Sequence, residues 1–331
     1  MMRINRILFI GLPIVVCLLS ANCANKINTV SILHANINCS DFEQSRLFYE
    51  KLGFVSLLES DAEASAEAAA GLHMPPYQLH ASTMVLPGDG FLIDLIRWID
   101  PYDPNPPYEL INHLGLSRLS LKTTNLDADI ATLQDQGVLF LSEPVTINRP
   151  VANSRLVCFR DPDGTLIELV ELGGTVVGLP NRGGTYINGI LHTSVNCSDF
   201  EVSRDFYEML GFVTQDEIEE TGTEDLAAAV GLTSPSYQIH ASRMSLPARS
   251  LNLTKWEDPY DPSTPYAHVN HIGIPRIAIW TLNIEADINI LKAQGVEFYS
   301  DPIRPEGAFG FLRFVCFEDP DGTVIELAQI F

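Results

Sequence analysis

Basic residues are scarce in this chain of 331 residues, which has 20 lysines and arginines against 42 aspartates and glutamates. The formal net charge is −22. Nucleic acids and anionic membrane surfaces both bind basic protein faces, so this balance argues against either as a partner. The excess of acidic side chains instead predicts a well-solvated surface.

Cysteine is also uncommon, with six in the chain. Their spacing contains no CxxC-type pair, which argues against a cysteine-ligated zinc site. Four of them lie within predicted strands or at strand ends, and we predict that they are buried free thiols. Disulfides are the alternative that an oxidising compartment would permit. These four residues are Cys39, Cys158, Cys197 and Cys316.

Long apolar runs are absent except for residues 7–21, and that run is short for a membrane span and contains Pro13. Arg3 and Arg6 precede it and small residues follow, as in a secretory signal. We therefore expect residues 1–25 to be an export leader and the protein to be periplasmic, secreted or lipid-anchored. The end of the run resembles a lipoprotein cleavage box, so an acyl group on Cys23 is the one membrane attachment to consider.

An internal repeat organises the rest of the chain. Residues 33–54 read LHANINCSDFEQSRLFYEKLGF, and residues 191–212 read LHTSVNCSDFEVSRDFYEMLGF, 158 positions later. The Pro-Tyr-Asp-Pro, Asn-His and Asp-Pro-Asp-Gly motifs also recur at this offset. A fixed long period indicates one structural unit built twice. We predict domains at residues 29–173 and 188–331, joined by a Gly-rich linker at 174–187.

The start of each repeat predicts a strand followed by a helix. From Leu33 to Asn38, Leu33, Ala35 and Ile37 alternate with polar residues, which indicates a strand with one apolar and one polar face. Ser40 is then expected to cap a helix, with Glu43 completing a capping box. Ser198 and Glu201 repeat this pattern in the second copy.

The remaining pattern predicts two βαβββ modules in each repeat and four in the protein. In the first module we expect a surface helix at 61–72, matched by 224–232, and strands at 77–86 and 91–98. In the second we expect a strand at 116–122, a helix capped by Asn125, and strands near 138–141, 155–160 and 165–170. The last two strands are joined by Asp-Pro-Asp-Gly, a sequence suited to a tight turn.

The motifs LHxxxNCSDFExSRxFYExLGF and DPDGTxIEL resemble the vicinal oxygen chelate superfamily, which includes glyoxalase I, methylmalonyl-CoA epimerase, extradiol dioxygenases and bleomycin-resistance proteins. The resemblance covers residues 30–331. It implies an α+β fold of two tandem domains, each of paired βαβββ modules that form a half-open mixed barrel. Because this fold hosts many chemistries, the motifs are more specific for the fold than for the reaction.

The resemblance also implies sites for a divalent metal such as Fe, Mn, Ni or Zn. Its ligand positions fall on the first and last strands of two facing modules. The sequence leaves open whether modules face each other across the repeats or within one repeat. Pairing across the repeats predicts one site with His34, Asp94, Arg276 and Glu326, and a second with His192, Asn252, Arg118 and Glu168. Asn252 is a weaker ligand than Asp94, so we expect the His34 site to be the better metal binder.

Arg118 and Arg276 occupy positions where the superfamily places a ligand, although a guanidinium has no lone pair to offer. We expect each to pair with a glutamate on a neighbouring strand, or to hold a substrate carboxylate or enolate-like oxygen. His80 and His240 are the other candidate catalytic residues, as a general base or an extra ligand. The alternative is that these histidines are hydrogen-bonded within the sheet.

The function implied is that of a small-molecule enzyme of the lyase, isomerase or dioxygenase type, with one divalent metal site. The alternative, from a different class, is a metal-free protein that sequesters a small ligand, as the bleomycin-resistance members do. Either protein would be a monomer or a homodimer. Metal content is the observation that separates the two hypotheses.

Overall fold

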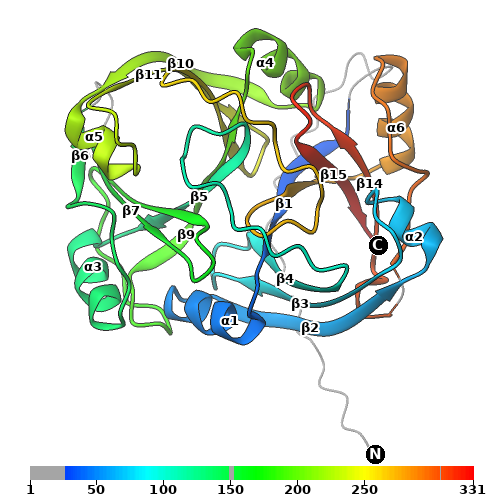
Figure 1. The fold of residues 1–331 in the computed structure, drawn as a ribbon, viewed down its shortest axis with the longest axis horizontal. Coiled ribbons are helices and arrows are strands. Elements are labelled where there is room, and N and C mark those ends of the chain that lie inside the picture. The colour runs from blue at the N-terminus through cyan, green and yellow to red at the C-terminus, as the bar shows by residue number, and fades with distance from the viewer. Residues whose placement is uncertain (1–26, 149–152, 306) are drawn as a thin grey trace, which may run out of the picture.

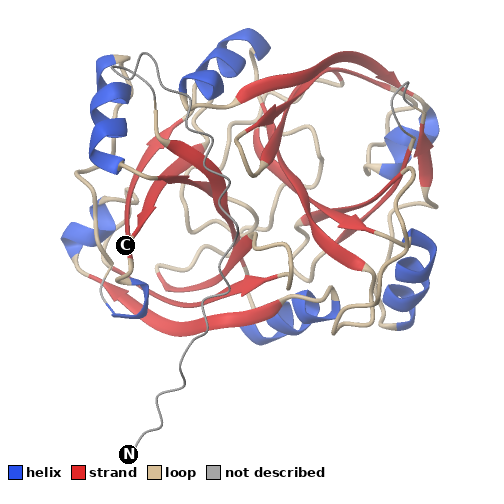
Figure 2. Ribbon diagram, turned by 180° about the vertical axis from the view of Figure 1, so that it is seen from behind, coloured by secondary structure: helices blue, strands red, loops and turns tan. Residues whose placement is uncertain are grey.

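The computed structural model describes residues 27–148, 153–305 and 307–331. The expected leader at 1–25, with Cys17 and Cys23, lies outside these residues. Within the described ranges, no helix is long and apolar enough to cross a membrane. Two curved sheets lie side by side, with the helices around their outer sides (Figures 1 and 2).

The first half-barrel is a seven-stranded mixed sheet in the order β14-β15-β13-β1-β4-β3-β2. Four of its strands come from the first repeat and three from the second. They are β1 (Thr29–Asn38), β2 (Val55–Ala64), β3 (Tyr77–Val85), β4 (Leu92–Asp100), β13 (Arg276–Thr281), β14 (Leu312–Glu318) and β15 (Val324–Ile330).

The second half-barrel is an eight-stranded mixed sheet in the order β10-β11-β12-β9-β5-β8-β7-β6. Its strands are β5 (Gly115–Thr123), β6 (Val145–Ile147), β7 (Ser154–Arg160), β8 (Leu166–Leu172), β9 (Ile187–Asn196), β10 (Val213–Gly222), β11 (Tyr237–Ser245) and β12 (Ser250–Asp258). The antiparallel pairs β1–β13 and β5–β9 join modules from different repeats. Modules therefore pair across the repeats, which decides the question that the sequence left open.

The helices are α1 (Phe42–Lys51), α2 (Ala66–Ala70), α3 (Leu126–Asp135), α4 (Phe200–Met209), α5 (Glu224–Ala229) and α6 (Ile284–Ala293), with a 3₁₀ turn at Gly307–Phe309. Asn125 caps α3 as predicted and accepts a hydrogen bond from the Ala128 amide at 3.2 Å. The α+β fold with two mixed half-barrels confirms the predicted fold class.

The predicted capping boxes are wrong by one residue. Asp41, not Ser40, caps α1 and accepts from the Gln44 amide at 3.0 Å. The Ser40 amide instead donates to Asp163 at 3.1 Å, which ties the start of α1 to the turn before β8. Glu43 pairs with Arg46. The second copy repeats the correction, with Asp199 capping α4 and Ser198 bonded to Asp321.

Two other predicted elements are also wrong in extent. Residues 61–64 belong to β2, because their backbone pairs with β3, and the helix is confined to Ala66–Ala70. Residues 138–141 form only an isolated bridge between Phe140 and Phe159, and the short strand β6 follows at Val145–Ile147. At residues 61–64, pairing with β3 prevailed over the helix-like local composition.

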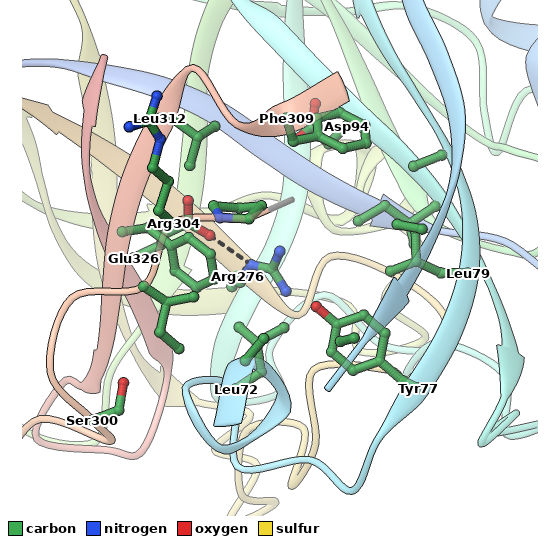
Figure 3. Close-up of a pocket in the computed structure, with 18 of the residues that line it drawn as sticks. Leu72, Tyr77, Leu79, Asp94, Arg276, Ser300, Arg304, Phe309, Leu312 and Glu326 are labelled. Carbon is green, nitrogen blue, oxygen red and sulfur yellow. Dashed lines mark hydrogen bonds and ion pairs between the residues drawn. The ribbon is translucent and has the colours of Figure 1, made fainter. Parts of the chain in front are cut away.

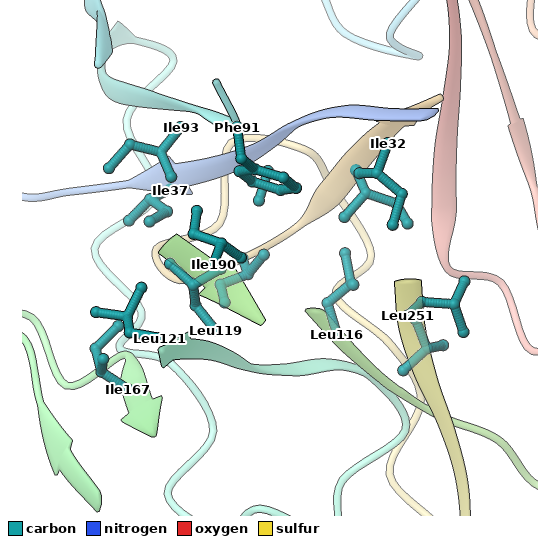
Figure 4. Close-up of a cluster of buried hydrophobic side chains, with 14 of the residues drawn as sticks. Ile32, Ile37, Phe91, Ile93, Leu116, Leu119, Leu121, Ile167, Ile190 and Leu251 are labelled. Carbon is teal, nitrogen blue, oxygen red and sulfur yellow. The ribbon is translucent and has the colours of Figure 1, made fainter. Parts of the chain in front are cut away.

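The main apolar core lies between the two half-barrels and under the helices. Figure 4 shows Ile37, Phe91 and Ile93 of the first half-barrel facing Leu119 and Ile190 of the second. Burying each such side chain stabilises the fold by about 1.5–3 kcal/mol. The four cysteines predicted to be buried free thiols are confirmed as such. The two Pro-rich connectors also meet, with the Tyr108 and Tyr266 rings stacked 4.8 Å apart.

Candidate functional site

The concave side of the first half-barrel holds a cavity of about 570 Å³ (Figure 3). Four polar residues predicted from the sequence line it together: His34, Asp94, Arg276 and Glu326. Apolar side chains form part of its walls, among them Leu72, Leu79, Phe309, Leu312 and Phe314. A cavity that combines apolar walls with convergent polar groups is the usual form of a small-molecule site.

His34 is the centre of the polar group. It lies on β1, where a register irregularity between Ile32 and His34 interrupts the simple alternation, so that Leu33 packs with the cavity wall rather than with Ala35 and Ile37. The His34 Nε2 atom is 3.5 Å from Asp94 Oδ2 and 3.9 Å from Glu326 Oε1. It is buried and has no hydrogen-bond partner among the described residues. A buried ring nitrogen close to two carboxylates has the donor chemistry of a metal ligand.

Neighbouring side chains hold both carboxylates in place. Asp94 Oδ1 accepts a hydrogen bond from Thr83 on the adjacent strand β3 at 2.7 Å. Glu326 Oε2 accepts from Arg276 Nε at 3.0 Å, because β13 and β15 run parallel and adjacent. Burial works against the charge on Arg276, but Glu326, together with Cys316, Tyr77 and Asp94, raises the pKa of Arg276 above its usual value. The predicted Arg–Glu pair is thus present in this site.

The second half-barrel brings Arg118, Glu168 and His192 together in the same way, but here a serine links the glutamate to the histidine. The Ser120 hydroxyl donates to Glu168 Oε2 and lies 2.9 Å from His192 Nε2. Arg118 Nε is 3.4 Å from Glu168 Oε1, an ion-pair contact without hydrogen-bond geometry. Asn252 turns to Thr254 Oγ1 at 3.2 Å. Among these described residues the His192 Nε2 atom has a partner, whereas the His34 Nε2 atom has none.

The pKa shifts of His192 and Glu168 agree with this difference between the two half-barrels. Burial, only partly offset by Glu168, lowers the pKa of His192 to about 4. Burial alone would raise the pKa of Glu168, yet Arg118 and the Ser120 hydroxyl help to lower it below its usual value. This cluster is therefore an anionic glutamate held by a guanidinium and a neutral imidazole.

His80 and His240, the other candidate catalytic residues, are not among the residues that line this cavity. On β3 the alternating residues Tyr77, Leu79 and Ala81 line the cavity, so His80 points to the other side of the sheet. There it contacts Asp61 at 2.7 Å and the Phe42 ring of α1. His240 likewise stacks on Phe200 with ring centroids 3.6 Å apart.

One group of three metal-ligating side chains lies outside the cavity. Among the described residues, only Glu201, Glu217 and His240 place one ligand atom each within 4.8 Å of one another. Both glutamates are exposed, and Arg204 already pairs with Glu201 at 2.5 Å. This group is the competing position for a metal in any binding experiment.

Reasoning from the sequence missed two residues that shape the sites. Tyr77 lines the cavity beside Arg276, and Ser120 bridges His192 and Glu168. Comparison of the two repeats contained a signal for the second: Ser120 corresponds to Ala278, 158 positions later.

Comparisons with known proteins agree with this architecture. The family model of the Glyoxalase/Bleomycin resistance protein/Dioxygenase superfamily matches residues 31–169 and 189–327. A single-substitution variant of glyoxalase I from Zea mays superposes with a TM-score of 0.61 and 17% identity, covering 91% of this chain and 93% of the maize chain. A Bacillus subtilis structure described provisionally as a dioxygenase gives 0.59 and 12%, covering 92% and 86%.

At the level of sequence, the uncharacterized protein YwkD of Bacillus subtilis strain 168 is 30% identical over 142 residues, which are 43% of this chain and 96% of YwkD. The structural neighbours are too distant in sequence to carry more than the fold. The family match, in contrast, covers most of both repeats. The chain therefore belongs to the Glyoxalase/Bleomycin resistance protein/Dioxygenase superfamily.

Proposed function

We propose that the protein is a small-molecule enzyme whose reaction takes place in the cavity of the first half-barrel, with a divalent metal held by His34, Asp94 and Glu326. The observation that carries this proposal is the buried, unpartnered Nε2 atom of His34, which lies 3.5 and 3.9 Å from the two carboxylates. One imidazole and two carboxylates form a donor set suited to Fe, Mn, Ni or Zn.

The metal would act as a Lewis acid that polarises oxygen atoms of the substrate. The protein's own residues supply the rest. Thr83 orients Asp94, and Arg276 holds Glu326 and presents its remaining nitrogens to an anionic group. The burial of His34, Arg276 and Glu326 strengthens these charge interactions. A lyase, isomerase or dioxygenase reaction is consistent with this arrangement.

Elemental analysis of the purified protein after dialysis tests the proposal. We expect about one equivalent of metal in the wild type and in His192→Ala, and its loss in His34→Ala. His240→Ala is the control for the exposed Glu201–Glu217–His240 group. Metal lost in His240→Ala but retained in His34→Ala would move the site to the surface. An absence of metal in all four proteins after reloading would exclude the metalloenzyme.

A metal-free ligand-binding protein is the second candidate. It is favoured by the Arg276–Glu326 pair, in which the guanidinium already balances one of the two carboxylates without a metal ion. This protein would bind its ligand in the same cavity and release it unchanged. Tight binding without metal and without product would establish it. Export, predicted from residues 1–25, is tested separately by the mass of the mature protein recovered from each cell fraction.

A further inference from the structure

We propose that the cavity contains a carboxylate-binding subsite formed by Arg276 and the Tyr77 hydroxyl, and that the substrate is a small monocarboxylate with an apolar body. This inference rests on the proposed function and names the class of molecule that the site would take. Three observations support it. They are the unpaired donors of Arg276 and Tyr77, the different pairing of the corresponding tyrosine in the second half-barrel, and the formal charge of the cavity.

Arg276 supplies the cation. The whole residue is only 8% exposed, and its Nε donates to Glu326. Its Nη1 is buried and has no hydrogen-bond partner among the described residues. Leaving a buried charged donor unpaired is destabilising, so a donor of this kind is usually satisfied by a ligand or by water. In Figure 3 the outer nitrogens of Arg276 point away from Glu326 and toward Tyr77.

Tyr77 supplies a second donor. Its ring packs edge-on against Trp98 with centroids 4.9 Å apart, which fixes the direction of its hydroxyl. That hydroxyl bonds to no other described residue. Burial raises the pKa of Tyr77, with Arg276 close enough to oppose the shift, so the group stays protonated and able to donate. A guanidinium and a phenol that converge on one point suit the two oxygens of a carboxylate.

In the second half-barrel the corresponding tyrosine has a hydrogen-bond partner within the protein. Tyr237, the counterpart of Tyr77, donates to Glu220 at 3.3 Å. Glu220 pairs in register with Ile239, and Ala62 pairs with Leu79 at the matching place in the first half-barrel. Ala62 lines the cavity and has no group that could accept from Tyr77. The first half-barrel thus keeps the tyrosine but lacks the carboxylate that would accept the hydrogen bond from its hydroxyl.

The charge of the cavity favours a monoanion once the metal is bound. Asp94, Glu326 and Arg276 together carry one formal negative charge, which a divalent cation turns into one positive charge. A single carboxylate then neutralises the site, and a dianion would not. The cavity rim carries Glu63 and Asp301 as well as Arg304, so the anion is recognised in the interior and not at the rim. By linkage, metal and carboxylate should each strengthen the binding of the other.

Calorimetric titration with matched acid and amide pairs tests the proposal. The probes are mandelate with mandelamide and 2-hydroxyhexanoate with its amide, added to the Mn²⁺-loaded protein. We expect at least one acid to bind tenfold or more tightly than its amide, because charge-assisted hydrogen bonds are stronger than neutral ones. Tyr77→Phe should weaken acid binding about three- to tenfold, since it removes one hydrogen bond. Tyr237→Phe is the matched control and should change nothing.

A second variant tests the subsite without changing Tyr77 itself. Ala62→Glu recreates the Glu220–Tyr237 arrangement in the first half-barrel, and we expect it to abolish the preference for acids while Tyr77 remains. Thermal unfolding of each variant shows whether the fold is kept. Equal affinities for acid and amide in the wild type, or no binding of either acid at millimolar concentration, would overturn the subsite.

The same data separate failure of the subsite from failure of the metal site. Metal binding that depends on His34, without a preference for acids, rejects the subsite alone. A preference for acids that Tyr77→Phe reduces, in a protein that binds no metal, supports the subsite and rejects the metalloenzyme.

Discussion

Ala278 stands in the first half-barrel where Ser120 stands in the second. In each sheet this residue lies in register between the histidine of one strand and the glutamate of another: Ala278 pairs with His34 and Glu326, and Ser120 pairs with His192 and Glu168. The serine hydroxyl bonds to both of its neighbours, whereas the alanine bonds to neither. The Ser120 hydroxyl therefore links histidine and glutamate in the second half-barrel, and the first half-barrel has no such link at Ala278.

Ala278→Ser is predicted to close the His34 site. The new hydroxyl would bridge His34 and Glu326 as Ser120 does, and a metal would have to break these hydrogen bonds. Hydrogen bonds to charged groups contribute about 1.5–3 kcal/mol, so the affinity for metal should fall by roughly tenfold or more. Calorimetric titration with Zn²⁺ measures it.

The reverse change is its control. Ser120→Ala leaves the first half-barrel untouched, so the affinity of the His34 site should stay within about twofold of the wild type, as expected for distant sites. An unchanged affinity in Ala278→Ser would show that the hydroxyl does not reach its neighbours, and the explanation of the asymmetry would fail.

Removing Arg118 is predicted to destabilise the second half-barrel. Arg118→Met leaves the buried Glu168 without its counter-ion, which typically costs about 3–5 kcal/mol. The pKa of Glu168 should then rise above that of the unfolded chain, so the variant should lose stability as the pH rises. Urea unfolding at several pH values measures both effects. Arg155→Met breaks the exposed pair with Asp127 and should cost less than about 1 kcal/mol.

The two sites could be assembled from the sequence only in part. The resemblance to the superfamily placed His34, Asp94, Arg276 and Glu326 on their strands. The alternation of polar and apolar residues, which is a local signal, agreed for His34 and Glu326. The role of Ser120 depends on the register of β5 with both β8 and β9, which joins residues 48 and 72 positions apart. No local pattern encodes that contact, so the sequence showed the serine without its partners.

The predictions that differ from the structure also depend on contacts between residues far apart in the sequence. The alternation on β3 places Tyr77 in the cavity and His80 outside it, but a strand's two faces cannot be assigned until the curvature of the sheet is known. Residues 61–64 read as helix on composition and became strand through pairing with β3. Ser40 and Asp41 both suit an N-cap, and the contact of Ser40 with Asp163 decided between them.

His80→Ala is predicted to leave the cavity unaffected. His80 packs on Phe42 and contacts Asp61 on the far side of β3, so its loss should change stability but not ligand binding. Metal affinity and acid preference should stay within about twofold of the wild type, as for independent sites. Thr83→Val, on the same strand but bonded to Asp94, should weaken metal binding. Equal losses in both variants would indicate a general distortion of the sheet.

Acid sensitivity is predicted at His113, a buried residue of the connector between β4 and β5. Burial lowers the pKa of His113 to about 4, although its hydrogen bond to the Leu114 carbonyl at 2.7 Å opposes the shift. The unfolded chain, with a pKa near the usual 6.5, therefore binds more protons between these values. Stability from this group is complete above pH ~6.5 and falls as the pH drops toward 4, by roughly 3 kcal/mol.

His113→Phe removes the titration while it keeps a ring against Tyr108, whose centroid lies 4.5 Å from that of His113. The variant loses the hydrogen bond to Leu114 at every pH, so its stability should start about 1 kcal/mol below that of the wild type at pH 7. The difference in stability should then shrink and reverse as the pH falls to 4. Only in the wild type does the unfolded chain gain a proton that the buried imidazole does not bind. Urea unfolding across this range measures both curves, and parallel curves would show that His113 does not titrate as its burial requires.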